Sequence, residues 1–240
     1  MAANPVVLVL GAGPRIGASV AEKFASNGYK VAVASRSGSG TKTAQGILSL
    51  KVDFTKPDTI PALFDAVKSE FHASPSVVVY NVAALTNPPD KDSVLSISAE
   101  SVASDLNVNT ISPYVAAQQA VSGWETLPKE TKKTFIYTGN IMNISIVPIP
   151  AMLDLGMGKS ASAFWIGLAD TTYSARGFRS VLQRKALSRL FLTCSLGSFM
   201  LMSVTGMVNL RAWRSTALHM ANSMHSWRTI RRMCHGTPRS

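Results

Sequence analysis

The sequence predicts an α/β fold in which helices cover both faces of a doubly wound parallel sheet. Up to residue 170, short β-branched or apolar runs alternate with longer amphipathic stretches, which is the order of strands and crossover helices. The first apolar run also ends in the glycine-rich turn Gly11–Gly17 (GAGPRIG), which leads into an amphipathic stretch. A strand, a glycine turn and a helix in this order are typical of Rossmann-type folds.

The expected elements follow this periodicity along the chain. The β-branched run VVLVL predicts a first strand, Pro14 fits the first turn of the helix that follows because its missing N–H costs nothing there, and VAVAS predicts a second strand. Glycine and proline mark loops at 37–41 (SGSGT) and 87–90 (NPPD). Strands are expected near residues 5–10, 30–35, 47–53, 76–81 and 133–138, and helices near 15–27, 57–73, 100–122 and 155–175.

The glycine turn is a candidate phosphate-binding loop. Glycines let the backbone approach a pyrophosphate, and the N-terminus of the helix offers unpaired N–H groups and a partial positive charge. The candidate cofactor-binding residues of this turn are Gly11, Gly13, Arg15, Ile16 and Gly17.

The end of the second strand predicts NADP rather than NAD. An acidic residue that binds the ribose of NAD is expected about 20 residues after the turn, yet no Asp or Glu lies between Glu22 and Asp53. Ser35 and Arg36 stand there instead, and a guanidinium suits the 2′-phosphate of NADP, with Arg15 as a second clamp. The alternative is that both arginines are ordinary surface residues.

Charge divides the chain at about residue 180. Residues 1–170 hold 13 Lys and Arg and all 13 Asp and Glu, whereas no acid follows Asp170, so the net charge of +11 belongs to the end of the chain. Surfaces of soluble domains normally mix both signs. We therefore expect a nucleotide-binding domain over 1–180, with a sheet incomplete at its C-terminal end, and a basic segment of uncertain fold over 181–240. That segment is either an out-of-frame extension or a basic, membrane-associating tail.

Other features of the chain bear on its partners and compartment. Residues 190–210 are 21 uncharged residues between Arg189 and Arg211, long enough to cross a bilayer, but diluted by polar residues and flanked by positive charge on both sides. Membrane association is therefore the less favoured interpretation.

Two distant cysteines favour a reducing compartment, the cytoplasm. Neither a metal site nor nucleic-acid binding is predicted, because no usual zinc spacing or binding motif is present.

These residues resemble the short-chain dehydrogenase/reductase family over about residues 5–180. The turn is similar to the family's Thr-Gly-x-x-x-Gly-x-Gly, with Gly11 and Gly17 retained and Arg15 at the middle glycine. The segment 52–54 (VDF) resembles the one that contacts adenine, which implies roles for Asp53 and Phe54, and Asn81 matches the second Asn of Asn-Asn-Ala-Gly.

The resemblance also implies a catalytic centre, which this chain changes. Asn109 matches the family's structural and catalytic asparagine, and Lys159 matches the lysine that holds the ribose and lowers the pKa of a tyrosine four residues earlier. That tyrosine position is Leu155, which carries no proton, and the serine position falls on Gly139, with Thr138 beside it. Asn109, Thr138 and Lys159 are thus the candidate catalytic residues.

The sequence leaves two functions open. The first is an NADP-dependent oxidoreductase that acts on a small-molecule carbonyl or alcohol, with weak or lost catalysis and possible homo-oligomers. The second is a non-catalytic NADP-binding protein that reports cofactor level or redox state, because the binding residues are better preserved than the chemical ones.

Overall fold

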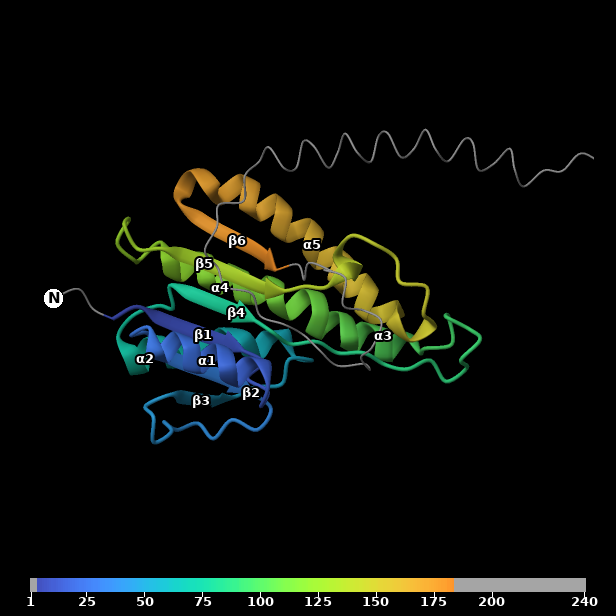
Figure 1. The fold of residues 1–240 in the computed structure, drawn as a ribbon, viewed down its shortest axis with the longest axis horizontal. Helices are drawn as coiled ribbons and strands as arrows, with labels where there is room; N and C mark the ends of the chain where they lie inside the picture. Colours follow the sequence, from blue (N-terminus) through green and yellow to red (C-terminus); the bar gives the residue numbers. More distant parts are fainter. Residues whose placement is uncertain (1–3, 184–240) are drawn as a thin grey trace, which may run out of the picture. The chain divides into compact units, whose positions relative to one another are not determined.

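A computed structural model of the chain describes residues 4–183 (Figure 1). Its six strands form one sheet in the order β3-β2-β1-β4-β5-β6, with every neighbouring pair parallel. The order reverses direction at β1, as the doubly wound prediction requires. The strands are β1 Val6–Leu10, β2 Lys30–Ser35, β3 Leu48–Lys51, β4 Val77–Tyr80, β5 Lys133–Thr138 and β6 Phe178–Gln183.

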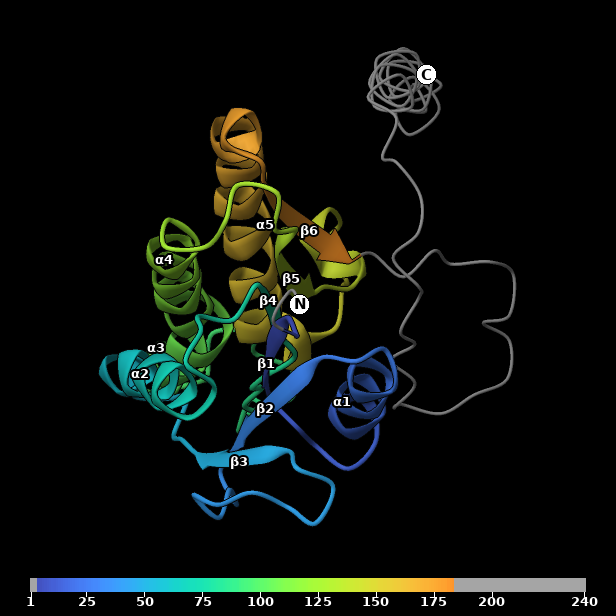
Figure 2. The same cartoon turned by 90° about the vertical axis from the view of Figure 1, so that its left-hand side faces the viewer.

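Helices lie on both faces of the sheet, as expected. Figure 2 shows α1 on one side and α2, α3 and α4 on the other. The helices are α1 Ile16–Ser26, α2 Ile60–Phe71, α3 Ala99–Leu106, α4 Ser112–Trp124 and α5 Leu153–Tyr173, with short 3₁₀ turns at Pro57–Thr59, Ile141–Asn143, Pro150–Met152 and Ser174–Arg176. The carboxyl ends of the strands lead into the loops that carry most candidate site residues.

The alternation of side chains along β1 divides the core into two layers. Val6, Leu8 and Leu10 pack with residues of α2, α4 and α5, whereas Val7 and Val9 pack with α1. Successive residues of a strand point to opposite faces, so a continuous apolar run such as VVLVL is stable only where both faces are covered. The buried strand predicted from this run is confirmed.

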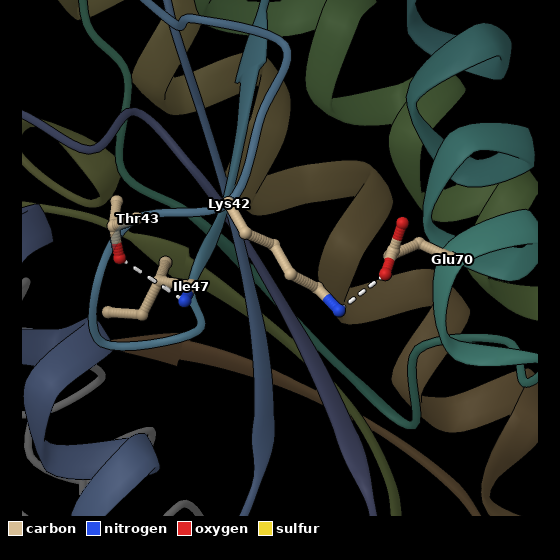
Figure 3. Close-up of polar contacts among 4 residues, drawn as sticks. All are labelled: Lys42, Thr43, Ile47 and Glu70. Carbon is tan, nitrogen blue, oxygen red and sulfur yellow. Dashed lines mark hydrogen bonds and ion pairs between the residues drawn. The ribbon is translucent and has the colours of Figure 1, made fainter.

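The edge strand β3 is protected by the segment that precedes it. Gly40 N–H donates to Ser49 O (2.8 Å) and Ser49 N–H donates to Thr41 O (2.9 Å), so this segment pairs along β3. Beyond it, Lys42 forms an ion pair with Glu70 of α2, and Ile47 N–H donates to Thr43 Oγ1 (3.3 Å; Figure 3). Covering an edge in this way blocks pairing with other chains.

Two elements differ from the sequence prediction. The helix expected over 100–122 is interrupted by a π-helical turn, Asn107–Ile111. A sixth strand, β6, also crosses the boundary expected at residue 180, because its backbone pairs with β5 from Phe178 to Gln183. Strand pairing, rather than a local apolar pattern, makes this segment a strand.

The remainder of the predicted basic segment, including residues 190–210, lies outside the described residues. Within residues 4–183, no helix has the length and apolarity to cross a membrane.

Candidate functional site

The glycine turn lies where the carboxyl ends of β1, β2 and β4 meet. Gly11 N–H donates to Ala34 O (2.9 Å), and Asn81 holds the turn from the other side, since its backbone N–H donates to Leu10 O (2.8 Å) and its Nδ2 donates to Gly11 O (3.2 Å). Gly11 has a φ of +94°, and a Cβ there would lie 2.8 Å from Val82 Cγ2. The turn therefore requires glycine at this position.

Gly17 and Gly13 have opposite surroundings. A Cβ on Gly17 would lie 2.4 Å from Gly11 O and 2.5 Å from Ala12 Cα, so the first turn of α1 packs directly on the loop. A Cβ on Gly13 would meet nothing within 4 Å. Gly17 is thus the glycine that allows close packing, whereas Gly13 faces open space.

We expect Gly17→Ala to lower the thermal unfolding midpoint, because forcing a methyl group into a packed site costs about 1–3 kcal/mol. Gly13→Ala is the matched control and is expected to leave the midpoint unchanged, because its methyl group enters open space and its φ is not positive. Thermal unfolding of both variants checks this, and equal midpoints would contradict the packing described for Gly17.

The two arginines are exposed beside this turn. Arg15 immediately precedes α1 and Arg36 immediately follows β2. Asp53 is also exposed, and hydrogen bonds from Thr55 chiefly lower the pKa of its carboxyl, with smaller contributions from the charges of Lys56 and then Arg36. Ser35 lies half-buried at the end of β2. The structure therefore brings these predicted residues to one end of the sheet.

Phe54 has a different place from the one expected of a cofactor contact. Its ring is buried against Tyr80, with the ring centroids 5.8 Å apart, and its backbone carbonyl accepts a hydrogen bond from Ser112 Oγ (2.8 Å). The side chain of Phe54 therefore belongs to the core. Of the segment 52–54, only Asp53 presents its side chain to the surface.

Asn109 occupies the π-helical turn and is completely buried. Its side chain pairs with the backbone of Ala84, because Ala84 N–H donates to Oδ1 (3.0 Å) and Nδ2 donates to Ala84 O (2.8 Å). Its own carbonyl accepts from Tyr137 Oη (2.9 Å) and Ser162 Oγ (2.8 Å). A π turn displaces a carbonyl from the regular ladder, which explains how Asn109 O reaches both hydroxyls. Asn109 thus joins three segments of the site.

Lys159 is a buried titratable group beside the end of β5. It lies on α5 with 2% of its surface exposed, and its Nζ donates to Thr138 O (2.7 Å) and lies 4.3 Å from the centroid of the Tyr137 ring. Burial lowers the pKa of Lys159 from 10.5 to about 7. Thr138 thus contributes its backbone carbonyl to this contact.

Leu155 lies one helical turn before Lys159 and is buried. Residues four apart share a face of a helix, so Leu155 lies on the same face of α5 as Lys159, as the resemblance implies for the tyrosine position. A leucine there can neither donate nor accept a proton.

The loop after β5 contains two asparagines that the sequence analysis missed. Asn140 and Asn143 form a reciprocal capping box, and Asn143 Nδ2 donates to Lys159 O (3.1 Å). This loop is therefore attached to α5 at the candidate lysine. The signal in the sequence was the spacing of two cap-forming residues three apart after a strand.

A cavity of about 800 Å³ lies between this loop and the beginning of α5. Its wall is mostly aliphatic, with no charged side chain among the described residues, and it reaches Ser160, the neighbour of Lys159. The polar lining residues are Asn143, Ser145 and Ser160, and the apolar ones include Val94, Met142, Ile144, Ile146, Val147, Ile149, Leu153 and Met157. Within residues 4–183, no group of three or more His, Cys, Asp or Glu side chains is placed to hold a metal ion.

Comparison with known proteins assigns this architecture to a family. The family described as Enoyl-(Acyl carrier protein) reductase matches residues 11–152. The short chain dehydrogenase/reductase dmxR12 of Cryptosporiopsis sp. (strain 8999) is 35% identical over 186 residues, which cover 73% of this chain and 74% of that protein. The chain belongs to the short-chain dehydrogenase/reductase family. It is therefore of the short-chain oxidoreductase type, as the sequence motifs predicted.

Solved structures of short-chain dehydrogenases/reductases share the fold. A Serratia marcescens enzyme has a TM-score of 0.60 and 24% identity, covering 76% of this chain and 77% of the other. The Brucella melitensis 3-ketoacyl-(acyl-carrier-protein) reductase complexed with NADH has a TM-score of 0.63 and 19% identity, covering 76% of this chain and 75% of the other. A metagenomic short-chain oxidoreductase complexed with NADP has a TM-score of 0.64 and 17% identity, covering 78% of this chain and 84% of the other.

Proposed function

We propose that this protein binds NADP and acts slowly as an oxidoreductase on an apolar carbonyl or alcohol. The observation that carries the proposal is the contrast between the two halves of the site. The glycine turn, Asn81 and the exposed arginines supply a dinucleotide-binding end, whereas the catalytic helix has Leu155 one turn before a buried Lys159.

The residues present fit NADP. The open space over Gly13, beside the N-terminus of α1, suits the pyrophosphate. The exposed guanidiniums of Arg15 and Arg36 suit a 2′-phosphate, and a guanidinium binds such a group through charge-assisted hydrogen bonds. Gly11, Ile16, Gly17, Ser35, Asp53 and Asn81 complete this end, with Phe54 supporting it from the core. When bound, the nicotinamide gives or accepts the hydride.

In the proposed reduction, the side chains of the protein donate a proton and position the reacting groups. In our proposal Lys159 binds the ribose and also donates the proton, because Leu155 has none to give. A lysine with a pKa of about 7 is still half protonated at that pH. Thr138 orients Lys159 through its carbonyl, and Asn109 fixes the surrounding segments.

The substrate end is the cavity beside Ser160. Its aliphatic wall favours an uncharged, apolar small molecule, since a charged one would lose its hydration without finding a partner there.

The test combines NADPH binding with turnover of apolar ketones. We expect NADPH to bind, reduction to be slow, and Lys159→Ala to abolish it. The rate should also fall as the pH rises above about 7, because the proton donor is then lost. Fluorescence titration measures binding, and the absorbance of NADPH measures turnover.

The outcomes separate the two candidate functions. Binding without turnover supports the non-catalytic, NADP-binding alternative, which Leu155 specifically favours. Rapid reduction that Lys159→Ala leaves unchanged would overturn the roles assigned to this helix.

A further inference from the structure

Two buried aspartates that the proposed chemistry does not use, one on α3 and one on α5, lie within hydrogen-bonding reach of each other. Asp105 lies in the last turn of α3 with 7% of its surface exposed, and Asp154 lies in the first turn of α5 with none exposed. The two helices pack against each other. A buried carboxylate is costly unless it is paired or hydrogen-bonded, so each of these groups requires an explanation.

Both carboxylate oxygens of Asp154 accept hydrogen bonds, whereas one carboxylate oxygen of Asp105 has no hydrogen-bond partner. Thr86 N–H donates to Asp154 Oδ2 (3.0 Å), and Leu155 N–H donates to Asp154 Oδ1 (2.7 Å). The Oδ2 atom of Asp105 is buried and has no hydrogen-bond partner. An ionised Asp105 would therefore place a second negative charge, poorly solvated, beside a carboxylate that already accepts two N–H groups.

We propose that Asp105 carries a proton, shares it with the Asp154 carboxylate, and that this pair positions the loop after β4 against the beginning of α5. Two neighbouring carboxyls that cannot both ionise share a proton in this way. Burial, followed by the effect of Asp154, raises the pKa of Asp105 from 3.8 to about 6.

The loop that this pair holds belongs to the candidate site. Thr86 lies two residues after Ala84, whose backbone pairs with the Asn109 side chain. The same loop begins at Asn81, which donates to Gly11 O of the glycine turn. On the other side, Asp154 accepts from the N–H of Leu155. Asp105 and Asp154 are thus positioning residues, connecting the cofactor end of the site to its catalytic helix.

The surrounding groups leave the pair without a neutralising cation. The neighbouring groups that shift the pKa of Asp105 are Asp154, which raises it, and Thr86, which lowers it. Lys159 of α5 directs its Nζ to Thr138 O, and the side chains of Glu100 on α3 and of Asp90, Lys91 and Asp92 in the loop are exposed. Loss of the shared proton therefore leaves two buried like charges, which weakens the attachment of the loop.

The pH dependence has a definite sign. Because folding raises the pKa of Asp105, the folded protein holds this proton more tightly than the unfolded chain does. Stability is therefore lost as the pH rises from about 4 to about 6, and the loss is complete above that range.

Asp105→Asn tests the proposal, because the amide keeps a donor toward Asp154 and cannot ionise. We expect the thermal midpoint of the wild type to fall relative to that of Asp105→Asn between about pH 4 and 6.5 and to run parallel above it. Asp65→Asn, an exposed site on α2, is the matched control and should follow the wild type. A constant offset between the wild type and Asp105→Asn at every pH would indicate a merely structural role and would overturn the shared proton.

A second measurement needs no variant. Carboxyl ¹³C NMR of the wild type should show one aspartate titrating near pH 6. Hydrogen exchange at Thr86 N–H should accelerate beyond its intrinsic dependence between about pH 4 and 6, and follow the intrinsic dependence above that range. An Asp105 that titrates near 4 contradicts the proposal. A further expectation, on the binding of NADPH, rests on the proposed function. The affinity for NADPH should fall between about pH 4 and 6 in the wild type and not in Asp105→Asn. If the stability and NMR results hold while NADPH fails to bind at any pH, the proposed function fails and the shared proton stands.

Discussion

Arg36→Asp is expected to reverse the cofactor preference of this protein from NADPH to NADH. The guanidinium follows β2 at the exposed end of the sheet, and no acidic residue lies between Glu22 and Asp53 to bind an unmodified ribose. A hydrogen bond to a charged group contributes about 1.5–3 kcal/mol, which corresponds to about a tenfold to hundredfold change in affinity. The new carboxylate repels the 2′-phosphate of NADPH and accepts hydrogen bonds from the 2′-hydroxyl of NADH.

Titration of both cofactors against both proteins measures the effect. Lys23→Asp, which makes the same change of charge in the last turn of α1, is the matched control and should leave the preference for NADPH in place. Equal affinity of the unmodified protein for NADPH and NADH would contradict the role of Arg36, because the 2′-phosphate is the difference between the two cofactors that a side chain there can detect.

Most of the fold was predictable because its signals are local. The runs that form β1, β2, β4 and β5 are apolar in themselves, and glycine and proline mark their ends. Strand β6 was missed because a single buried aromatic, Phe178, is followed by Arg179 and Ser180, and pairing with the distant β5 is what makes them a strand. The π-helical turn was missed because no residue pattern distinguishes it from a regular helix.

The candidate site shows the same division. Gly11, Gly17 and Asn81 were predicted from short motifs, and their contacts agree with the close packing that those motifs require. The contact between Asp105 and Asp154 joins residues 49 positions apart, so only the packing of α3 on α5 brings them together. The hydrogen bond from Asn109 Nδ2 to Ala84 O likewise depends on a loop whose path the sequence does not specify.

Leu155→Tyr is expected to raise the rate of ketone reduction by up to about 100-fold, the low end of the usual contribution of a positioned general acid, because Lys159 already supplies a proton in the wild type. Residue 155 lies on the same face of α5 as Lys159, one turn earlier, so a phenol there would stand beside the buried amine. A positive charge on that amine favours the phenolate and lowers the pKa of the phenol toward neutrality. Single-turnover oxidation of bound NADPH in the presence of an apolar ketone measures the rate.

Leu155→Phe separates proton donation from packing. Its ring has nearly the size of tyrosine and no hydroxyl, so any change in the shape of the cavity or in the placement of α5 affects both variants alike. If the proposal is right, the tyrosine variant is faster than the phenylalanine variant, both bind NADPH as the wild type does, and Lys159→Ala removes the gain because the tyrosine then loses its neighbouring charge. Equal rates in the two variants would mean that a proton is not what limits this site, and that the leucine belongs to a protein whose function is to bind the dinucleotide.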